Sequence, residues 1–390
     1  MPPDSPTVLG DLCFFVKETC DCSFADSDTY VSTESMLPNI AGITASGSIP
    51  LTGLVNKYRQ KDILISNIRP YFKKIWQSDR CGTCSNDVLV LRAKDERISD
   101  YLFALLSEDC FFDYVMLGSK GTKMPRGDKN QILTYPINKQ TFSEMLAIGN
   151  FISLIKRKIT CNQAINDNLE AQISALFSKT IESSNRNTIR FGSLIKIGSG
   201  GTPKTSIGEY WSGEIPFLSP KDIDGVYTYS TEKYLTKLGL DNCNSGHYPK
   251  NTTIITARGT VGKITLVARD MAMNQSCYAI MARNKGQEHY IHQLSLYAAD
   301  SIKQKSNGAV FDAINAKDIT EESVPDITTY DIISFEREVT PLYDMIWENG
   351  KEIRSLSAIR DYLLPKLMSG EIDVSTLKIP TKYSFTPSNK

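Results

Sequence analysis

The chain has 390 residues, of which 41% are hydrophobic and 9% aromatic, and its 44 basic side chains are balanced by 44 acidic ones. This length and composition exclude a disordered or fibrous protein and indicate two to four domains. Because the net charge is zero, a nucleic-acid interface would require basic residues segregated on one face.

The sequence shows no feature of an exported or membrane protein. No segment approaches the roughly 18 uninterrupted apolar residues of a membrane span, and no basic stretch precedes an apolar run near the N-terminus. The nine cysteines form no regular framework, which favours reduced thiols over disulfides. We therefore expect a soluble, cytoplasmic protein with no membrane partner.

In chain order, the sequence predicts a globule, a long helix, a second globule, a second long helix and a polar tail. The globules, 1–141 and 181–333, mix short β-like runs and turn residues with a helical stretch, at 101–115 and 290–305. The helices are expected over 142–180 and 334–372, because apolar residues recur there at alternating three- and four-residue steps. The tail is 373–390. Both globules are predicted to be α+β.

The two halves repeat one pattern. The first helix has its seam at Ile152, Ile155, Ile159, Asn162, Asn166, Leu169, Ile173 and Leu176. Each position recurs 187 residues later, at Val339, Leu342, Ile346, Asn349, Ile353, Leu356, Arg360 and Leu363. The globules repeat as well: residues 9–12 correspond to 191–194, and the β-branched run 62–66 corresponds to 252–256. A duplicated unit is therefore expected.

The shared seam predicts that the two helices pack as an antiparallel coiled coil, each about 54 Å long at 1.5 Å per residue. This packing gives an approximate two-fold axis and two similar globules that face one ligand at a fixed separation. Asn162 and Asn349 lie near the expected crossing, where the hypothesis is that they bond to each other; the alternative is that both lie at the edge of the seam and face water. The alternative is that the helices merely hold a two-domain enzyme together.

Basic residues gather at corresponding places of the repeat. The stretch 57–75 has a net charge of +5, its counterpart 250–269 holds four basic residues, and a Gly-rich loop at 120–129 adds another cluster. Such clusters suit phosphate contacts, whereas Arg, Asn and Gln suit contacts to base edges. We predict that Lys73 and Lys74 touch phosphate and that Arg258 reads a base. The full set of predicted DNA-binding residues is Asn67, Arg69, Tyr71, Lys73, Lys74, Lys120, Thr122, Lys123, Arg126, Thr202, Lys204, Lys221, Arg258, Thr260, Lys263, Asn274 and Gln275.

Three strings of the sequence resemble the specificity subunits of type I restriction-modification systems. These are RDYLLPKLMSGEI at 360–372, IGSGGTPKT followed by YWSGEIPFLSPKDI within 197–223, and DILISNIRPYFKK at 62–74. The resemblance implies two target recognition domains that read a split DNA site, and two spacer helices. It also implies two DNA methyltransferase subunits and restriction helicase and nuclease subunits as partners. The family string includes Pro365, so a bend near Leu364 is expected, with Gly370 capping the helix.

The resemblance implies a subunit that is not an enzyme and binds no cofactor itself, with S-adenosylmethionine, ATP and magnesium on its partners. A phosphate loop at 197–205 is disfavoured because Pro203 stands where Gly is required. A zinc site of Cys20, Cys22, Cys81 and Cys84 is the less favoured alternative to free thiols. Neither a methyltransferase nor a nuclease signature is found. A DNA-modifying enzyme and a non-DNA adaptor protein remain the alternative functions.

Overall fold

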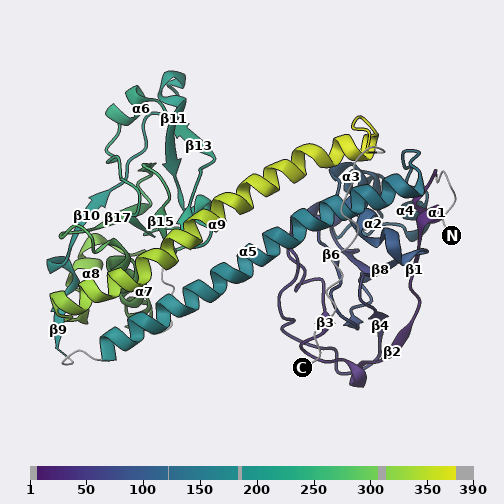
Figure 1. Ribbon diagram of the computed structural model, residues 1–390, viewed down its shortest axis with the longest axis horizontal. Helices are drawn as coiled ribbons and strands as arrows, with labels where there is room; N and C mark the ends of the chain where they lie inside the picture. Colours follow the sequence, from purple (N-terminus) through teal and green to yellow (C-terminus); the bar gives the residue numbers. More distant parts are fainter. Residues whose placement is uncertain (1–6, 122, 183–186, 306–312, 375–390) are drawn as a thin grey trace. The chain divides into compact units, whose positions relative to one another are not determined.

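The computed structural model describes residues 7–121, 123–182, 187–305 and 313–374. The chain divides into two compact units, Met1–Ile159 with Leu356–Lys390 (unit 1) and Thr160–Ser355 (unit 2). Figure 1 shows the α+β architecture, in which two long helices each contribute one part to each unit. The predicted tail lies, from 375 onward, outside the described residues.

Unit 1 contains two four-stranded sheets. Their orders are β1(Cys13–Phe15)-β8(Val88–Ala93)-β5(Ile63–Ser66)-β6(Ile75–Gln77) and β2(Thr19–Asp21)-β4(Leu54–Tyr58)-β7(Gly82–Cys84)-β3(Tyr30–Val31). Its helices are α1(Leu9–Leu12), α2(Ser99–Leu106), α3(Asp109–Leu117) and α4(Lys129–Leu133), with 3-10 turns η1(Cys22–Phe24), η2(Pro70–Phe72) and η3(Glu96–Ile98). The helical stretch expected at 101–115 is thus two helices, separated where Glu108 takes an extended backbone conformation.

Unit 2 contains a five-stranded, a three-stranded and a two-stranded sheet. Their orders are β10(Ile195–Ser199)-β17(Cys277–Ala282)-β14(Thr253–Thr256)-β15(Ile264–Val267)-β12(Tyr227–Thr228), β13(Lys233–Leu235)-β11(Trp211–Leu218)-β16(Ala272–Met273) and β18(Ser323–Pro325)-β9(Thr188–Arg190). The helices are α6(Lys237–Asp241), α7(Glu288–Lys305) and α8(Ala316–Glu321), with 3-10 turns η4(Phe191–Ser193), η5(Gly208–Tyr210) and η6(Pro220–Asp222).

The main sheets of the two units have the same topology. The antiparallel order β1-β8-β5-β6 recurs as β10-β17-β14-β15. The N–H of Leu9 donates to the Tyr135 carbonyl, and the N–H of Phe191 donates to the Glu322 carbonyl. The predicted correspondence of 9–12 with 191–194 and of 62–66 with 252–256 is therefore confirmed.

The long helices α5(Phe142–Glu182) and α9(Thr329–Ser369) are each 41 residues long. They begin 187 residues apart, which confirms the predicted register, although α9 begins five residues before the predicted start. A reciprocal pair of hydrogen bonds caps each helix, Thr141 with Glu144 and Thr328 with Asp331.

The predicted seam is the buried face of both helices, since every seam residue is buried or half-buried. In unit 2 the helices run antiparallel, because Asn162 Nδ2 donates to Glu352 Oε2 at 2.7 Å while Asn349 Nδ2 donates to Asn166 Oδ1 at 2.8 Å. The predicted bond between Asn162 and Asn349 is therefore wrong. Each asparagine bonds to a side chain of the partner helix that lies about one helical turn from the other asparagine. The stagger of two helices is set by their packing and not by the periodicity of either sequence.

The C-terminal end of α9 agrees in part with the expectation. Gly370 adopts a left-handed backbone (φ +78°), and its N–H donates to the Leu367 carbonyl, which confirms the predicted cap. The helix continues through Pro365 to Ser369.

Each globule packs a helix against one of the long helices through an equivalent contact. In unit 1 a Cβ on Gly149 would lie 2.6 Å from the backbone nitrogen of Tyr101, so glycine permits the close approach of α5. At the equivalent place of unit 2, the Glu336 carboxylate accepts a 2.7 Å hydrogen bond from the Tyr290 N–H. None of the helices in the described ranges has the length and apolarity of a membrane span.

Candidate nucleic-acid interface

In unit 2, three predicted residues line one small pocket. Gly200 allows the chain to approach the 274–276 turn, because a Cβ there would lie 1.8 Å from the Asn274 carbonyl oxygen. The Thr202 hydroxyl donates to Gln275 Oε1. Thr202, Asn274 and Lys221 then border a pocket of about 170 Å³. The structure therefore brings together residues that are far apart in the sequence.

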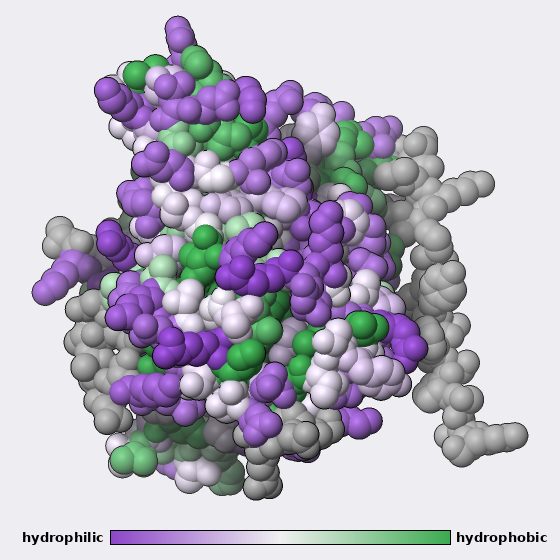
Figure 2. All heavy atoms as spheres, turned by 90° about the vertical axis from the view of Figure 1, so that its left-hand side faces the viewer, coloured by the Kyte–Doolittle hydropathy of each residue, from purple (hydrophilic) through white to green (hydrophobic). Residues whose placement is uncertain are grey.

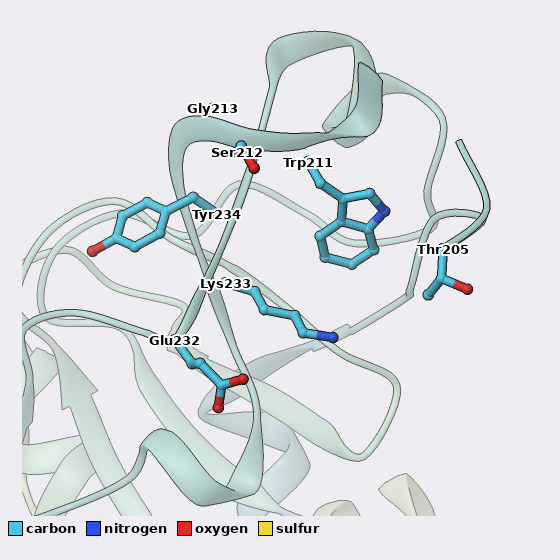
Figure 3. Close-up of a pocket in the computed structure, with 7 residues that line it drawn as sticks. All are labelled: Thr205, Trp211, Ser212, Gly213, Glu232, Lys233 and Tyr234. Atoms are coloured by element: carbon cyan, nitrogen blue, oxygen red, sulfur yellow. The ribbon is translucent and has the colours of Figure 1, made fainter. Parts of the chain in front are cut away.

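Beside this pocket lies a larger hollow of about 580 Å³ that the sequence analysis missed (Figure 3). The Lys233 ammonium lies 5.4 Å from the centre of the Trp211 ring, and Glu232 forms an ion pair with Lys221. An aromatic ring with cations beside it is a common surface for bases and phosphates. Trp211 lies in the string YWSGEIPFLSPKDI, where no local sequence pattern distinguishes it from a tryptophan of the core.

A third group of predicted DNA-binding residues in unit 2 lies on the turn between β14 and β15. Gly259 and Gly262 have positive φ angles of 80° and 82°, and the Thr256 hydroxyl bonds to both the Thr260 carbonyl and the Lys263 N–H. This closed turn leaves the side chains of Arg258, Thr260 and Lys263 exposed. Arg258 forms neither a hydrogen bond nor an ion pair through its side chain with any described residue, so its donors are available to a ligand. Lys204 is likewise exposed.

In unit 1, the 67–69 segment lies against Pro125 and Arg126. Ile68 forms an antiparallel bridge with Arg126, and the Arg69 N–H donates to the Pro125 carbonyl at 2.9 Å. Asn67 Oδ1 and Arg69 Nε are buried atoms without a hydrogen-bond partner among the described residues. Arg69 itself has a left-handed backbone (φ 51°), which places a non-glycine residue in a strained conformation.

The other predicted residues of unit 1 are more dispersed. Lys73 Nζ pairs with Asp109 at 2.6 Å, and Lys74 Nζ donates to the Thr33 carbonyl at 2.7 Å. Tyr71 is 47% exposed, and its ring packs at a tilt against that of Phe72, with ring centroids 4.7 Å apart. Lys123 is exposed, and Thr122 lies outside the described residues.

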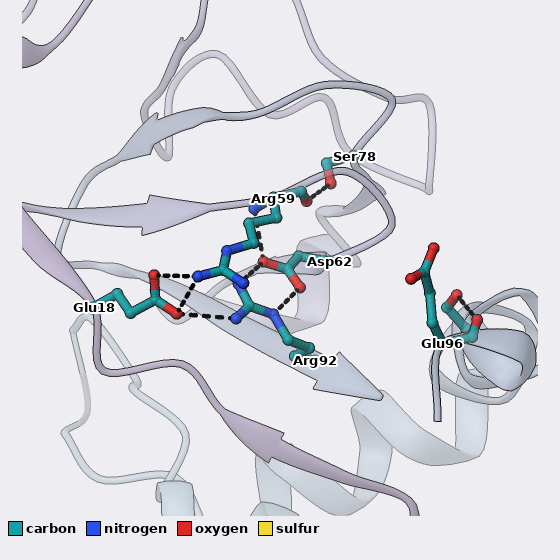
Figure 4. A network of polar contacts seen from close by, with 7 residues as sticks. Glu18, Arg59, Asp62, Ser78, Arg92 and Glu96 are labelled. Atoms are coloured by element: carbon teal, nitrogen blue, oxygen red, sulfur yellow. Dashed lines mark hydrogen bonds and ion pairs between the residues drawn. The ribbon is translucent and has the colours of Figure 1, made fainter. Parts of the chain in front are cut away.

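Acidic side chains pair with several of the predicted basic residues. Lys120 pairs with Asp128 at 3.0 Å, and this contact lowers the pKa of the Asp128 carboxyl. Figure 4 shows a network in which Arg59, a member of the basic run, contacts Glu18. Arg92 bridges Glu18 and the buried Asp62, and it lowers the pKa of Glu18. The basic run at 57–75 is therefore less positive in the folded protein than its composition indicated.

The four cysteines considered for zinc do not form a common cluster. Cys22 and Cys84 are buried whereas Cys81 is exposed, and all are free thiols. Within the described ranges, the structure contains no group of three or more His, Cys, Asp or Glu side chains placed to hold a metal ion. The face drawn in Figure 2 is mostly hydrophilic, with hydrophobic side chains in small separated patches.

Residues 184–325 match the family described as Type I restriction modification DNA specificity domain. The chain resembles type I specificity subunits. The MjaIX specificity subunit of Methanocaldococcus jannaschii is 26% identical over 135 residues, which cover 33% of this chain and 31% of that relative. The HindI specificity subunit of Haemophilus influenzae is 24% identical over 178 residues, which cover 44% and 39%. The chain thus matches only about a third of the length of these relatives.

Among solved structures, the S subunit of a type I restriction-modification system from M. genitalium shares the fold. The two chains superpose with a TM-score of 0.62 over 93% of this chain and 95% of the other, at 15% sequence identity. The similarity therefore extends over both units, including the first globule and both long helices, which lie beyond the matched family domain.

Proposed function

We propose that this protein is the sequence-specific DNA-binding subunit of a type I restriction-modification complex. The observation that supports the proposal best is the repeat of one sheet topology in both units, β1-β8-β5-β6 and β10-β17-β14-β15. In each unit, exposed polar and basic loops lie next to this sheet. The residues predicted to bind DNA are proposed to do so from these loops. In unit 2, Thr202, Lys221 and Asn274 border one pocket and Gln275 bonds to Thr202, while Arg258 lies on the separate turn between β14 and β15.

Each globule is proposed to read one half of a split target, 1–141 one half and 181–333 the other. The two helices, 142–180 and 334–372 in the predicted boundaries, would set the separation. In this proposal the chain performs no chemistry. Two methyltransferase subunits supply S-adenosylmethionine chemistry, and restriction subunits supply ATP- and magnesium-dependent steps.

A gel-shift titration of the purified chain with duplex DNA tests the proposal. Because phosphate contacts release counterions, affinity should fall about 10³-fold between 50 and 200 mM salt if roughly six phosphates are contacted. Binding that is absent or insensitive to salt would favour the adaptor alternative. Consumption of S-adenosylmethionine by the isolated chain would favour the DNA-modifying enzyme.

If each globule reads its own half of the target, the result of a domain exchange can be predicted. When residues 1–141 are replaced by the same region of a relative with a different target, one half of the methylated motif should change and the other half should persist. The measurement is the mapping of methylated bases across the genome of a host that expresses the complex. A change in both halves, or in neither, would contradict independent reading by the two globules.

A further inference from the structure

We infer that Arg126 reads a guanine in the half-site of unit 1 and that Asp87 is its positioning residue. This inference rests on the proposed function, and it assigns Arg126 to base reading instead of the phosphate contacts that its basic cluster suggested. Its basis is that Arg126 is held rigidly at a backbone bridge, and that the equivalent bridge of unit 2 also contains an arginine, Arg258.

The backbone of Arg126 is fixed on both sides. Its N–H and carbonyl exchange two 3.0 Å hydrogen bonds with Lys120, and it forms an antiparallel bridge with Ile68 on the other side. A side chain that starts from such a backbone loses little conformational freedom when it binds a ligand.

The guanidinium is held as well. Arg126 Nη2 lies 2.9 Å from Asp87 Oδ1 and 3.1 Å from Oδ2, while the side chain is 55% exposed. Asp87 is anchored because its carbonyl accepts a 2.8 Å hydrogen bond from the Asn67 N–H. The carboxylate contacts only Nη2, which carries two N–H groups, so Nη1 and the second N–H of Nη2 can still form the planar fork that matches the O6 and N7 acceptors of guanine.

The same backbone bridge recurs in unit 2 with the arginine on the opposite strand. There Arg258 pairs with Ala313, so that Arg258 stands at the place of Ile68 and Ala313 at the place of Arg126. The N–H of Ala257 donates to the Ser276 carbonyl, as the N–H of Asn67 does to the Asp87 carbonyl, so Ser276 stands at the place of Asp87. Each unit therefore presents one arginine at this bridge, but among the described residues only that of unit 1 has an acidic side chain to orient it.

An exposed ion pair by itself contributes little to stability, so the inferred role of this one is to orient the guanidinium. A carboxylate that orients an arginine also restricts which acceptors the arginine can reach, which converts a general cation into a selective donor pair.

Selection of bound duplexes from a randomised library, with the full chain as bait, tests this inference. The informative variants are Arg126→Lys, which keeps the charge but loses the planar fork, and Asp87→Asn, which keeps the shape of the side chain but loses its charge. The matched control is Arg97→Lys, because Arg97 forms a similar exposed pair with Asp95 at 2.6 Å on the same unit.

Arg126→Lys should reduce the preference for guanine about 5- to 150-fold at one base pair, with the other positions and the salt dependence unchanged. Asp87→Asn should weaken the same position only, and affinity for random duplex should stay equal or rise because one negative charge is lost. The affected base pair should lie in the half-site that changes when 1–141 is exchanged. Arg97→Lys should retain the whole motif.

The inference is overturned if Arg126→Lys retains the full motif, or if it weakens all sequences alike, as a phosphate contact would. A wild-type chain that selects no motif would instead overturn the proposed function. Thermal unfolding of each variant verifies that a lost preference does not come from a lost fold.

Discussion

Replacing Glu336 by alanine is expected to lower the free energy of unfolding of unit 2 by about 3–5 kcal/mol. The Glu336 carboxylate is buried, lies 2.9 Å from His289 Nδ1, and accepts the N–H of Tyr290 in the first turn of α7. Without it, the Tyr290 N–H has no acceptor and the buried imidazole loses its charged partner. Urea unfolding measures the loss, and hydrogen exchange of the α7 amides locates it.

The Thr340 hydroxyl also contacts His289 Nδ1, at 3.3 Å, but the other polar side chains nearby are bonded to one another. Burial lowers the pKa of His292 to about 3, so its ring stays neutral, and its Nδ1 forms a 2.8 Å hydrogen bond with the Tyr343 hydroxyl. Gln293 Nε2 donates to the same hydroxyl oxygen. His292, Gln293 and Tyr343 thus form hydrogen bonds with one another between α7 and α9.

Two further variants make the Glu336 prediction specific. Glu336→Gln keeps an acceptor for the Tyr290 N–H and should cost less than the alanine variant. Glu338→Ala changes an exposed residue on the same helix and should alter stability by less than about 0.5 kcal/mol. Equal stability of Glu336→Ala and Glu338→Ala would show that the buried network does not stabilise unit 2.

Alanine at Gly200 is expected to lower the free energy of unfolding by about 2–3 kcal/mol and to weaken DNA binding by unit 2. The new Cβ would lie 1.8 Å from the Asn274 carbonyl oxygen and 2.8 Å from that of Met273, so the backbone of one loop must move. Because this contact brings Thr202 next to Gln275, its loss should separate two groups of predicted DNA contacts. Unfolding and the gel-shift titration measure the two effects.

Gly208→Ala is the matched control, since a Cβ on Gly208 would meet no atom within 4 Å. This variant should bind DNA like the wild type and change stability by less than about 0.5 kcal/mol. If Gly200→Ala behaves like the control, the close approach of the two loops is not needed for folding or for binding.

Local pattern and repetition were sufficient to predict the architecture of this protein. The two helices follow from a seam that needs only the period of the α-helix, and their 187-residue offset is a property of the sequence alone. The strands β5 and β14 were predicted from runs of β-branched residues, and the cap at Gly370 from a glycine after the last helical turn. The start of α9 was misplaced although Thr328 and Asp331, which bond to each other at the start of the helix, have the sequence spacing of a capping box.

Only the tertiary structure decided which side chains meet. Asn162 contacts Glu352 because of how two helices are staggered, and Arg126 contacts Asp87 because a loop returns to the sheet 39 residues later. Such pairs depend on distances through space, which neither spacing nor composition encodes. For the same reason the sequence showed a strongly basic stretch at 57–75, whereas the folded chain places Glu18 against Arg59 and Arg92 and leaves a smaller set of cations exposed to a ligand.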